Sequence, residues 1–195
     1  MSSTGLWLFI AVQIFFVLVT VGFLAFIGYV LWSFRKEVPY VPTPRHVVRR
    51  MVEDVPFAPH ARVLDLGSGH GRIVRAVARR HPVSVTGIED SPVLIFISRL
   101  LTALDRLRGP YAGTVAYTRA NFHDVPLQDV QVVLCFLTDE VMASLAAKFT
   151  AELPIGATLV SYLFPLVASD AFRIASVTQV GKRPRQKLYV YTKVA

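Results

Sequence analysis

Residues 63–72, VLDLGSGHGR, decide the fold of this chain. The stretch Arg62–Leu66 (RVLDL) is a short apolar run typical of a buried strand, and Arg72–Arg80 has the spacing of an amphipathic helix. Glycines at positions 67, 69 and 71 lie between them, where they let the backbone turn tightly and approach a ligand closely. Glu89 follows the last of these glycines by 18 positions. A strand, a glycine-rich turn, a helix and a later acid are typical of a nucleotide-binding unit.

Strands and helices largely alternate from this unit to residue 163. We expect a short helix at 46–55, strands at 62–66, 83–88, 114–118, 130–136 and 158–163, and helices at 72–80, 92–106 and 138–150. Such alternation predicts an α/β fold with a Rossmann-like, mostly parallel sheet covered on both faces. Residues 172–180 and 187–194 differ, because only the basic turn GKRPRQ separates them. They predict a C-terminal antiparallel strand pair.

The first 34 residues differ in composition from the rest. They contain no Asp, Glu, Lys or Arg, and residues 5–34 are dominated by apolar side chains and glycine. A helix needs about 20 apolar residues to cross a bilayer. Trp7 lies near one end of the run, and Tyr29 and Trp32 near the other, which suits the two membrane interfaces. We therefore expect a transmembrane helix at 5–34. The alternative is a cleaved signal peptide, whose basic start and shorter apolar core are missing here.

The segment after the apolar run indicates an orientation. Five basic residues follow the run and none precedes it: Arg35, Lys36, Arg45, Arg49 and Arg50. The positive-inside rule then predicts that the C-terminal domain lies in the cytosol or an equivalent interior compartment. Residues 38–44, VPYVPTP, contain three prolines and predict a stiff, extended connector. The chain thus divides into a transmembrane helix at 5–34, a linker and N-terminal segment at 35–61, and a ligand-binding domain at 62–195.

The position of the acidic residue relative to the glycines indicates which ligand binds at this turn. Dinucleotide sites use G-x-G-x-x-G and hold a pyrophosphate. Here the pattern is D-x-G-x-G-x-G, and Asp65 would repel a pyrophosphate but attract the ammonium and sulfonium of S-adenosyl-L-methionine. Glu89 suits the ribose hydroxyls, and Asn121 and Phe122 suit adenine. We expect S-adenosyl-L-methionine as cofactor, rather than an incidental structural turn, with these contacts: Asp65, Gly67, Ser68, Gly69, Gly71, Glu89, Asn121 and Phe122.

Several stretches together resemble one protein family. They are PYVPT at 39–43, DLGSGHGR at 65–72, ANF at 120–122, AELPIGATLVSYLFPL at 151–166 and LYVYT at 188–192. The chain resembles the small membrane-anchored protein lysine methyltransferases, which include the enzymes for ATP synthase subunit c and the adenine nucleotide translocase, with bacterial relatives. The resemblance covers residues 38–195. It departs from the family at His70, where Asp is usual, and is only partly matched at Phe122, His123 and Asp124.

The resemblance implies a class I methyltransferase domain that acts on lysine side chains of a membrane-associated protein. It also implies that PYVPT helps to close the cofactor site, which adds Pro42 and Thr43 to the expected contacts. We expect a single-pass protein of a bacterial cytoplasmic membrane, with the mitochondrial inner membrane as the alternative location. Two rival functions are a methyltransferase for a lipid or small molecule, and a non-catalytic S-adenosylmethionine-binding membrane protein.

Candidate catalytic residues follow the fourth and fifth expected strands. A lysine nucleophile must first lose a proton, because its reference pKa is about 10.4. Asp139, Glu140 and Tyr162 are expected at the carboxyl edge of the sheet, beside the turn at 164–165, where oxygen atoms can orient an amine. Asp139 and Glu140 have an equally simple interpretation as a helix cap and a first-turn charge.

Other features of the sequence argue against a disulfide, a metal ion and a nucleic-acid partner. Cys135 is the single cysteine, so no internal disulfide forms, and we expect a buried apolar side chain. The Cys and His residues lack metal-ligand spacing, so no metal is expected. An N/D-P-P-Y/F motif does not follow the fourth strand, which argues against methylation of adenine or glutamine amino groups. The basic turn near residue 183 suits anionic lipid as well as nucleic acid, and without a recognised binding module we expect no nucleic-acid partner.

Overall fold

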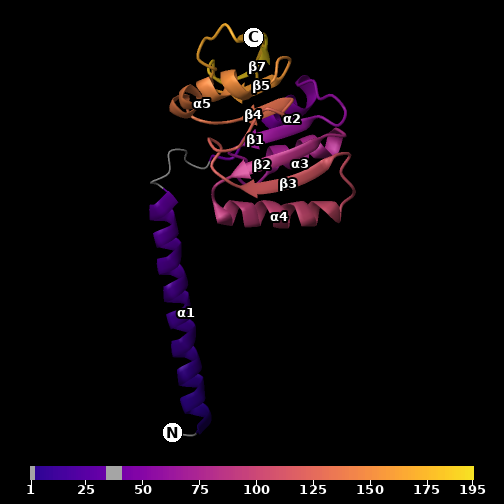
Figure 1. Cartoon of the computed structure of the whole chain (residues 1–195). Coiled ribbons are helices and arrows are strands. Elements are labelled where there is room, and N and C mark those ends of the chain that lie inside the picture. Colours follow the sequence, from indigo (N-terminus) through magenta and orange to yellow (C-terminus); the bar gives the residue numbers. More distant parts are fainter. Residues whose placement is uncertain (1–2, 34–40) are drawn as a thin grey trace. The chain divides into compact units, whose positions relative to one another are not determined.

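The computed structural model describes residues 3–33 and 41–195, with side chains described for residues 5–28 and 41–195. The chain forms two units, Met1–Pro39 and Tyr40–Ala195 (Figure 1). The first contains helix α1, Ser3–Ser33. Its described side chains are exposed and uncharged, and Gly5–Gly28 is long and apolar enough to cross a membrane. The expected interface aromatics Tyr29 and Trp32, and the basic Arg35 and Lys36, lie outside the described side chains.

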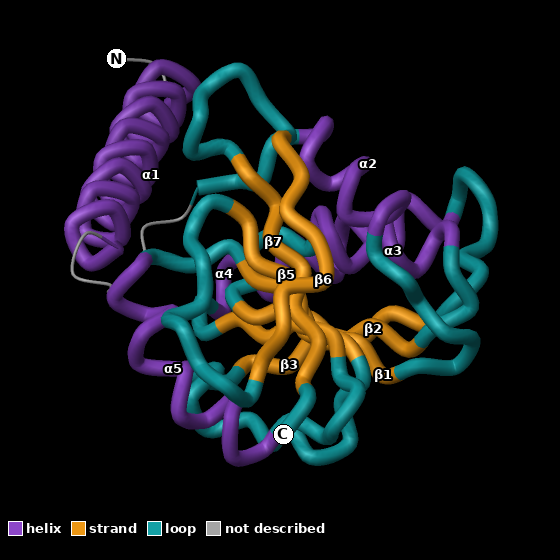
Figure 2. The backbone as a smooth tube through the Cα atoms, turned by 90° about the horizontal axis from the view of Figure 1, so that it is seen from above, coloured by secondary structure: helices purple, strands orange, loops and turns teal. Residues whose placement is uncertain are grey.

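A seven-stranded sheet forms the centre of the second unit (Figure 2). Its order is β3-β2-β1-β4-β5-β7-β6. The strands are β1 Arg62–Leu66, β2 Ser84–Glu89, β3 Thr114–Arg119, β4 Val132–Cys135, β5 Thr158–Tyr162, β6 Phe172–Gln179 and β7 Lys187–Lys193. β1 to β5 are parallel, whereas β7 is antiparallel to both of its neighbours, β5 and β6. The predicted C-terminal antiparallel pair is confirmed.

Helices cover both faces of the sheet (Figures 1 and 2). They are α2 Arg45–Asp54, α3 Arg72–Arg80, α4 Pro92–Arg106 and α5 Asp139–Glu152. Because strand side chains point alternately to the two faces, Val63 and Val85 join the core cluster shared by α2, α3 and α4. On the opposite face, Cys135 and Ser161 contact Met142 of α5.

The connections around β1 locate the site. From β1 the chain adds β2 and β3 on one side, and then β4 and β5 on the other. Ligands of open parallel sheets bind at the carboxyl ends of the strands at such a reversal. The glycine turn at 67–71 leaves β1 at this point, and Glu89 ends the adjacent strand β2.

Most element ends agree with the sequence predictions. α3 and α4 begin and end where expected, and Ser91 caps α4 by accepting a hydrogen bond from the Leu94 amide at 3.4 Å. β4 is shorter than the predicted 130–136, because the Val130 amide bonds to the Leu127 carbonyl in a turn before the strand. α5 starts after the capping residue Thr138 and continues two residues beyond the predicted end.

Candidate functional site

The glycine turn is fixed by backbone geometry. Gly67, Gly69 and Gly71 have φ angles of 73°, 55° and 73°, in the left-handed region that favours glycine. The amides of Gly67 and Ser68 both donate to the Ile88 carbonyl at 2.9 Å, which fastens the turn to the end of β2. A Cβ atom at Gly71 would collide with the ring of Tyr117. Both conformation and space therefore require glycine at position 71.

Glu89 connects the glycine turn to the start of α4. Its Oε2 accepts a hydrogen bond from the Gly69 amide at 3.0 Å, and its Oε1 accepts one from the Ser91 amide at 2.9 Å. A carboxylate offers about four acceptor positions, so two bonds leave capacity for two hydroxyl groups. The structure thus brings together Glu89 and the central glycine of the turn, both expected cofactor contacts.

Asp65 is buried at the turn and has an acceptor atom without a donor. The residue is 2% exposed, and its Oδ2 has no hydrogen-bond partner among the described residues. Burial, and then repulsion from the Glu89 carboxylate, raise the pKa of Asp65 to about 8. The Ser68 Oγ is buried and also without a partner within the described part of the chain. A cationic group at the turn would supply the missing donor and the opposite charge, as the ammonium of S-adenosylmethionine would.

The segment before α2 is tied to the glycine-motif helix. The Thr43 carbonyl accepts a hydrogen bond from Arg72 Nη1 at 2.5 Å, and Thr43 is buried. Arg72 is the first residue of α3, directly after the glycine turn. Pro42 is exposed, while Pro39 and Tyr40 of the PYVPT segment lie outside the described residues. The hydrogen bond from Arg72 to the Thr43 carbonyl was not predicted, although Arg72 is part of the glycine motif at 63–72.

The expected adenine contacts lie in the turn after β3. Asn121 is exposed, and its Oδ1 accepts a hydrogen bond from the His123 amide at 3.0 Å. The Ala120 amide donates to the Glu89 carbonyl at 3.2 Å, which keeps this turn beside the end of β2. Phe122 is half-buried, with its ring centre 4.9 Å from that of His123. Asn121 therefore holds its own turn through its oxygen and retains its side-chain amide as a donor.

The three candidate catalytic residues occupy two different environments. Asp139 and Glu140 are exposed in the first turn of α5, whose N-cap is Thr138. Hydrogen bonding to its own backbone amide, and then to Thr138, lowers the pKa of Glu140. Tyr162 is 1% exposed, and its ring centre lies 4.9 Å from that of Phe136. The acids therefore face solvent, whereas Tyr162 is packed into the core.

The turn after β5 contains a strained residue that the sequence did not reveal. Leu163 has a φ angle of 72°, which is unusual for a residue other than glycine. Ser161 Oγ donates to the Phe164 carbonyl at 2.6 Å, and the Leu166 amide donates to the Tyr191 hydroxyl at 3.0 Å. These bonds fix the FPL turn, residues 164–166, from both sides. Backbone strain of this kind is concentrated at functional sites.

Two further side chains have altered pKa values. Burial, and then the charges of Arg72 and Arg75, lower the pKa of His70 to about 4, so its ring is neutral at physiological pH. Cys135 is fully buried, and burial raises the pKa of its thiol to about 12, as expected of a buried apolar cysteine. Among the described residues, no three Cys, His, Asp or Glu side chains are grouped to hold a metal ion.

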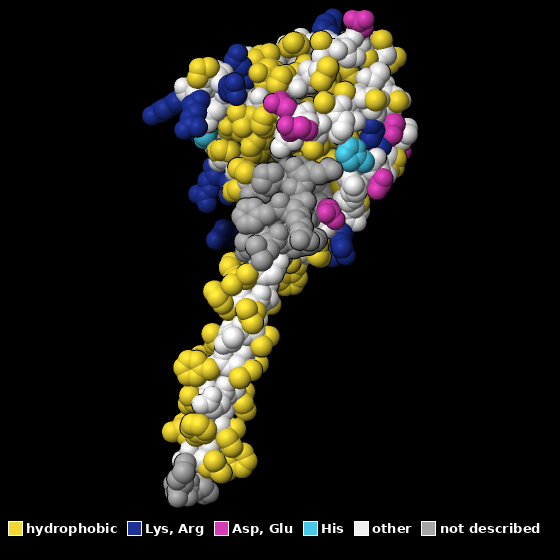
Figure 3. Space-filling model, turned by 90° about the vertical axis from the view of Figure 1, so that its left-hand side faces the viewer, with side chains coloured by type: hydrophobic (Ala, Val, Ile, Leu, Met, Phe, Trp, Pro, Cys, Tyr) yellow, Lys and Arg dark blue, Asp and Glu magenta, His cyan; other side chains and the backbone are white. Residues whose placement is uncertain are grey.

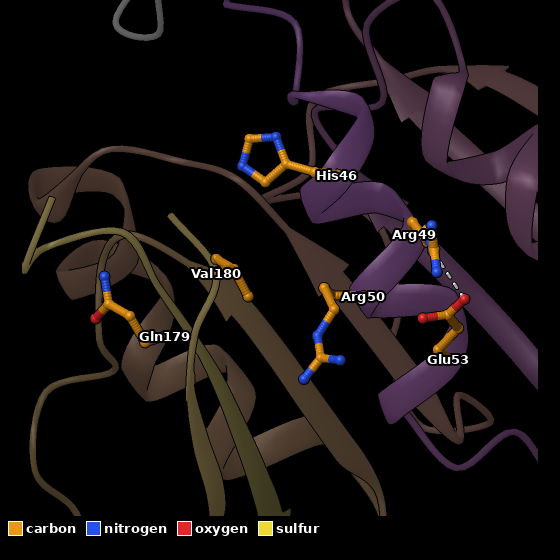
Figure 4. Close-up of a pocket in the computed structure, with 6 residues that line it drawn as sticks. All are labelled: His46, Arg49, Arg50, Glu53, Gln179 and Val180. Atoms are coloured by element: carbon orange, nitrogen blue, oxygen red, sulfur yellow. Dashed lines mark hydrogen bonds and ion pairs between the residues drawn. The ribbon is translucent and has the colours of Figure 1, made fainter. Parts of the chain in front are cut away.

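A separate pocket lies between α2 and the end of β6 (Figure 4). It is lined by His46, Arg49, Arg50, Glu53, Gln179 and Val180, and Arg49 pairs with Glu53 at 3.0 Å. None of these residues is an expected cofactor or catalytic contact. The predicted cofactor contacts Ser68, Gly69 and Glu89 lie at the glycine turn and not in this pocket.

Known proteins match this chain across the site. Residues 65–171 match the ANTKMT methyltransferase domain. The chain is 35% identical over 160 residues to a protein-lysine N-methyltransferase of Saccharolobus islandicus. The alignment covers 81% of this chain and 96% of that protein. Over 132 residues the chain is 36% identical to the adenine nucleotide translocase lysine N-methyltransferase of Mus musculus, which covers 68% of this chain and 56% of that protein.

A solved structure has the same arrangement of the domain. It is an RNA methyltransferase from Salinibacter ruber in complex with S-adenosyl-L-homocysteine. The TM-score is 0.67 and the sequence identity 27%, over 79% of this chain and 94% of that chain. S-adenosyl-L-homocysteine is the demethylated form of the cofactor that Asp65, the glycines and Glu89 indicate.

Proposed function

Because the chain belongs to the ANTKMT methyltransferase family and is a class I, S-adenosylmethionine-dependent methyltransferase, we propose that it methylates lysine side chains of a membrane-associated protein. The observation that carries the proposal is the match to a protein-lysine N-methyltransferase over 96% of that relative. The mouse relative is named for an adenine nucleotide translocase, although this chain spans only 56% of its length.

The proposed cofactor site is formed by the ends of β1 and β2. Asp65 and Ser68 offer oxygen atoms to the ammonium, and Glu89 accepts hydrogen bonds from the ribose hydroxyls while it holds the Gly69 amide. Asn121 and Phe122 lie in the turn that contacts adenine. Thr43, through Arg72, closes the site from the segment before α2, with exposed Pro42 beside it.

The proposed acceptor site lies beside α5 and the FPL turn. The cofactor supplies an electrophilic methyl group on a sulfonium. The task of the protein is to align a neutral lysine amine with that methyl group and to exclude water. Asp139 and Glu140 orient the incoming lysine through charge, and the rigid FPL turn forms the wall of its channel. The lysine loses its proton to bulk water before the neutral amine enters the site. Tyr162 supports this wall from within the core rather than touching the amine.

We propose that α1 anchors the enzyme in a membrane. Its span of 24 uncharged residues supports this role, and Figure 3 shows hydrophobic side chains along the described part of α1. A signal sequence would satisfy the same length and composition. The basic residues that follow support an orientation with the domain on the cytosolic side of a bacterial cytoplasmic membrane, or alternatively on the matrix side of a mitochondrial inner membrane.

The function is tested by methyl transfer to native membranes. The purified full chain is incubated with methyl-labelled S-adenosylmethionine and membranes of its own source, and the products are separated into protein, lipid and RNA fractions. We expect label in a membrane-protein band and methylated lysine in its peptide mass spectrum. Label in the lipid extract instead would support the rival lipid enzyme, and label in RNA would assign a nucleic-acid substrate.

A matched pair of variants controls this assay. Glu89→Ala removes the ribose acid, whereas Glu152→Ala removes an acid whose Oε2 accepts a hydrogen bond from the Leu127 amide at 3.1 Å. Label that disappears only with Glu89→Ala originates from this enzyme. A complete absence of label in all three fractions, while the cofactor still binds, would indicate a non-catalytic binding protein.

A further inference from the structure

Helix α4 has a stripe of large apolar side chains on its outer surface. The exposed residues are Val93 at 42%, Phe96 at 67%, Leu100 at 49% and Leu104 at 51%, followed by the C-cap Leu107 at 84%. Their spacing of three or four residues places them on one side of the helix. A contiguous exposed apolar surface of this kind indicates an interaction site.

Only three residues of α4 are fully buried, and two of them are polar, while Leu94, Ile97 and Leu101 are half-buried. The fully buried residues are Ile95, Ser98 and Thr102. Ser98 Oγ donates to the Ile95 carbonyl, and Thr102 Oγ1 bonds to the Ser98 carbonyl, each at 2.8 Å. A surface helix ordinarily turns its apolar side to the core and its polar side to water. In α4 the exposed apolar side chains lie opposite Ile95, Ser98 and Thr102, so core packing does not explain them.

Basic side chains flank the apolar stripe. Arg99, Arg106 and Arg108 are exposed, and Arg99 also donates a hydrogen bond to the Tyr117 carbonyl at 3.3 Å. The one acid of the helix, Asp105, is half-buried and already paired with Arg75 at 3.1 Å, with Arg79 at 3.8 Å and with Arg108 at 3.7 Å. An apolar stripe bordered by arginines is the pattern of a helix that lies in the interface of an anionic membrane.

We propose that α4 is a lipid-contacting helix, which lies in the surface of an anionic bilayer with Phe96, Leu100 and Leu104 among the acyl chains and the arginines at the phosphates. This contact rests on the proposed membrane location but not on the methyl acceptor. A second copy of the chain fits the surface less well, since it would bring the arginines of both helices together without a free carboxylate between them. Phospholipid phosphates supply the complementary charge.

The chain permits a test with a single reactive thiol. Its one cysteine, Cys135, is fully buried and has a raised pKa, so it does not compete for a maleimide. Leu100→Cys places a thiol in the stripe. Ile155→Cys is the matched control, because Ile155 is an apolar residue that is 76% exposed in the turn before β5, across the sheet from α4. The full chain is reconstituted with vesicles of phosphatidylcholine, with or without phosphatidylglycerol, and labelled with a membrane-impermeant maleimide.

We expect Leu100→Cys to react about tenfold more slowly than Ile155→Cys on anionic vesicles, as for a helix docked about nine-tenths of the time. The protection should decrease in high salt and in an Arg106→Gln/Arg108→Gln background. Equal labelling of both thiols on vesicles with which the chain floats would overturn the α4 contact alone. If Leu100→Cys is also protected in detergent, and its protection increases with protein concentration, the stripe contacts a second copy of the chain. That result would overturn the lipid contact.

Two other outcomes also decide the matter. Equal protection of Leu100→Cys on zwitterionic vesicles would overturn the preference for anionic lipid. A chain that does not float with vesicles would overturn both the α4 contact and the α1 anchor. None of these measurements uses methyl transfer, so a failure of the proposed lysine methylation is detected separately.

Discussion

The two sides of the carboxyl edge of the sheet are built differently. At the ends of β1 and β2, Glu89 already accepts two backbone hydrogen bonds and Asp65 is buried at the turn. Beside β4 and β5, the acids Asp139 and Glu140 are exposed, although the FPL turn is fixed by two hydrogen bonds. We infer that the cofactor side is preorganised by this chain, whereas the acceptor side is completed by the protein that it methylates.

The largest effect is expected from Gly71→Ala. The new Cβ would collide with Tyr117, whose hydroxyl bonds to Thr102 Oγ1 at 2.9 Å, so the turn must shift. We expect cofactor affinity to fall by at least about a hundredfold, equivalent to about 3 kcal/mol. Gly156→Ala is the control, because Gly156 also has a positive φ, of 85°, but nothing lies near its added Cβ. Calorimetric titration of both variants checks this, and equal affinities would contradict the preorganised turn.

Glu89→Ala should have the next largest effect. It leaves the amides of Gly69 and Ser91 without their acceptor and removes the proposed ribose contact. Losing such bonds costs about 1–3 kcal/mol, which weakens cofactor binding by about 5- to 150-fold. Glu152→Ala, which also removes an acceptor for a backbone amide, should leave affinity unchanged. If both variants bound the cofactor equally, Glu89 would have a purely structural role.

The pH dependence of cofactor binding tests the role of Asp65 on the preorganised side of the sheet edge. The pKa of Asp65 is raised to about 8, so the free protein carries this proton at neutral pH. Binding a cation favours the carboxylate and must release the proton. Affinity should therefore increase as pH rises, by up to about tenfold per unit between about pH 6 and pH 7.5. Asp65→Asn should remove this slope in calorimetric titrations. A flat profile for the wild type would exclude an ionised Asp65 as the partner of the ammonium.

The smallest effects are expected on the acceptor side. Asp139→Asn and Glu140→Gln change exposed charges, which solvent screens, so turnover should fall by less than about tenfold and cofactor affinity should stay constant. Steady-state rates on a soluble lysine peptide measure this. A slightly lower melting temperature with unchanged turnover would favour the helix-dipole interpretation. A loss of turnover above about a hundredfold would instead make either acid an essential base.

Local signals made much of this structure predictable. Ser91 and Pro92 specify the start of α4, and the glycines with Asp65 specify the turn and its ligand, because each depends on neighbouring residues. Gly69 and Glu89 were both expected at the cofactor site, since parallel strands bring their carboxyl ends to one edge, but the hydrogen bond between them was not predicted.

Other features depend on contacts between distant residues. The bond between Arg72 and the Thr43 carbonyl joins positions 29 residues apart, and Tyr117 fills the space beside Gly71 from β3. The left-handed backbone of Leu163 has no sequence signature, because any residue except glycine disfavours it. Strand periodicity also did not show which face Tyr162 would join, so its burial in the core emerged only from packing.

The insertion of β7 between β5 and β6 has a consequence for synthesis of the protein. Lys187–Lys193 is the last strand of the chain, yet it forms an interior strand of the sheet. Until the ribosome releases these residues, β5 has an unpaired edge and Tyr191 cannot hold the Leu166 amide. The turn after β5 is therefore completed only once residues 187–193 have been synthesised and have paired with β5.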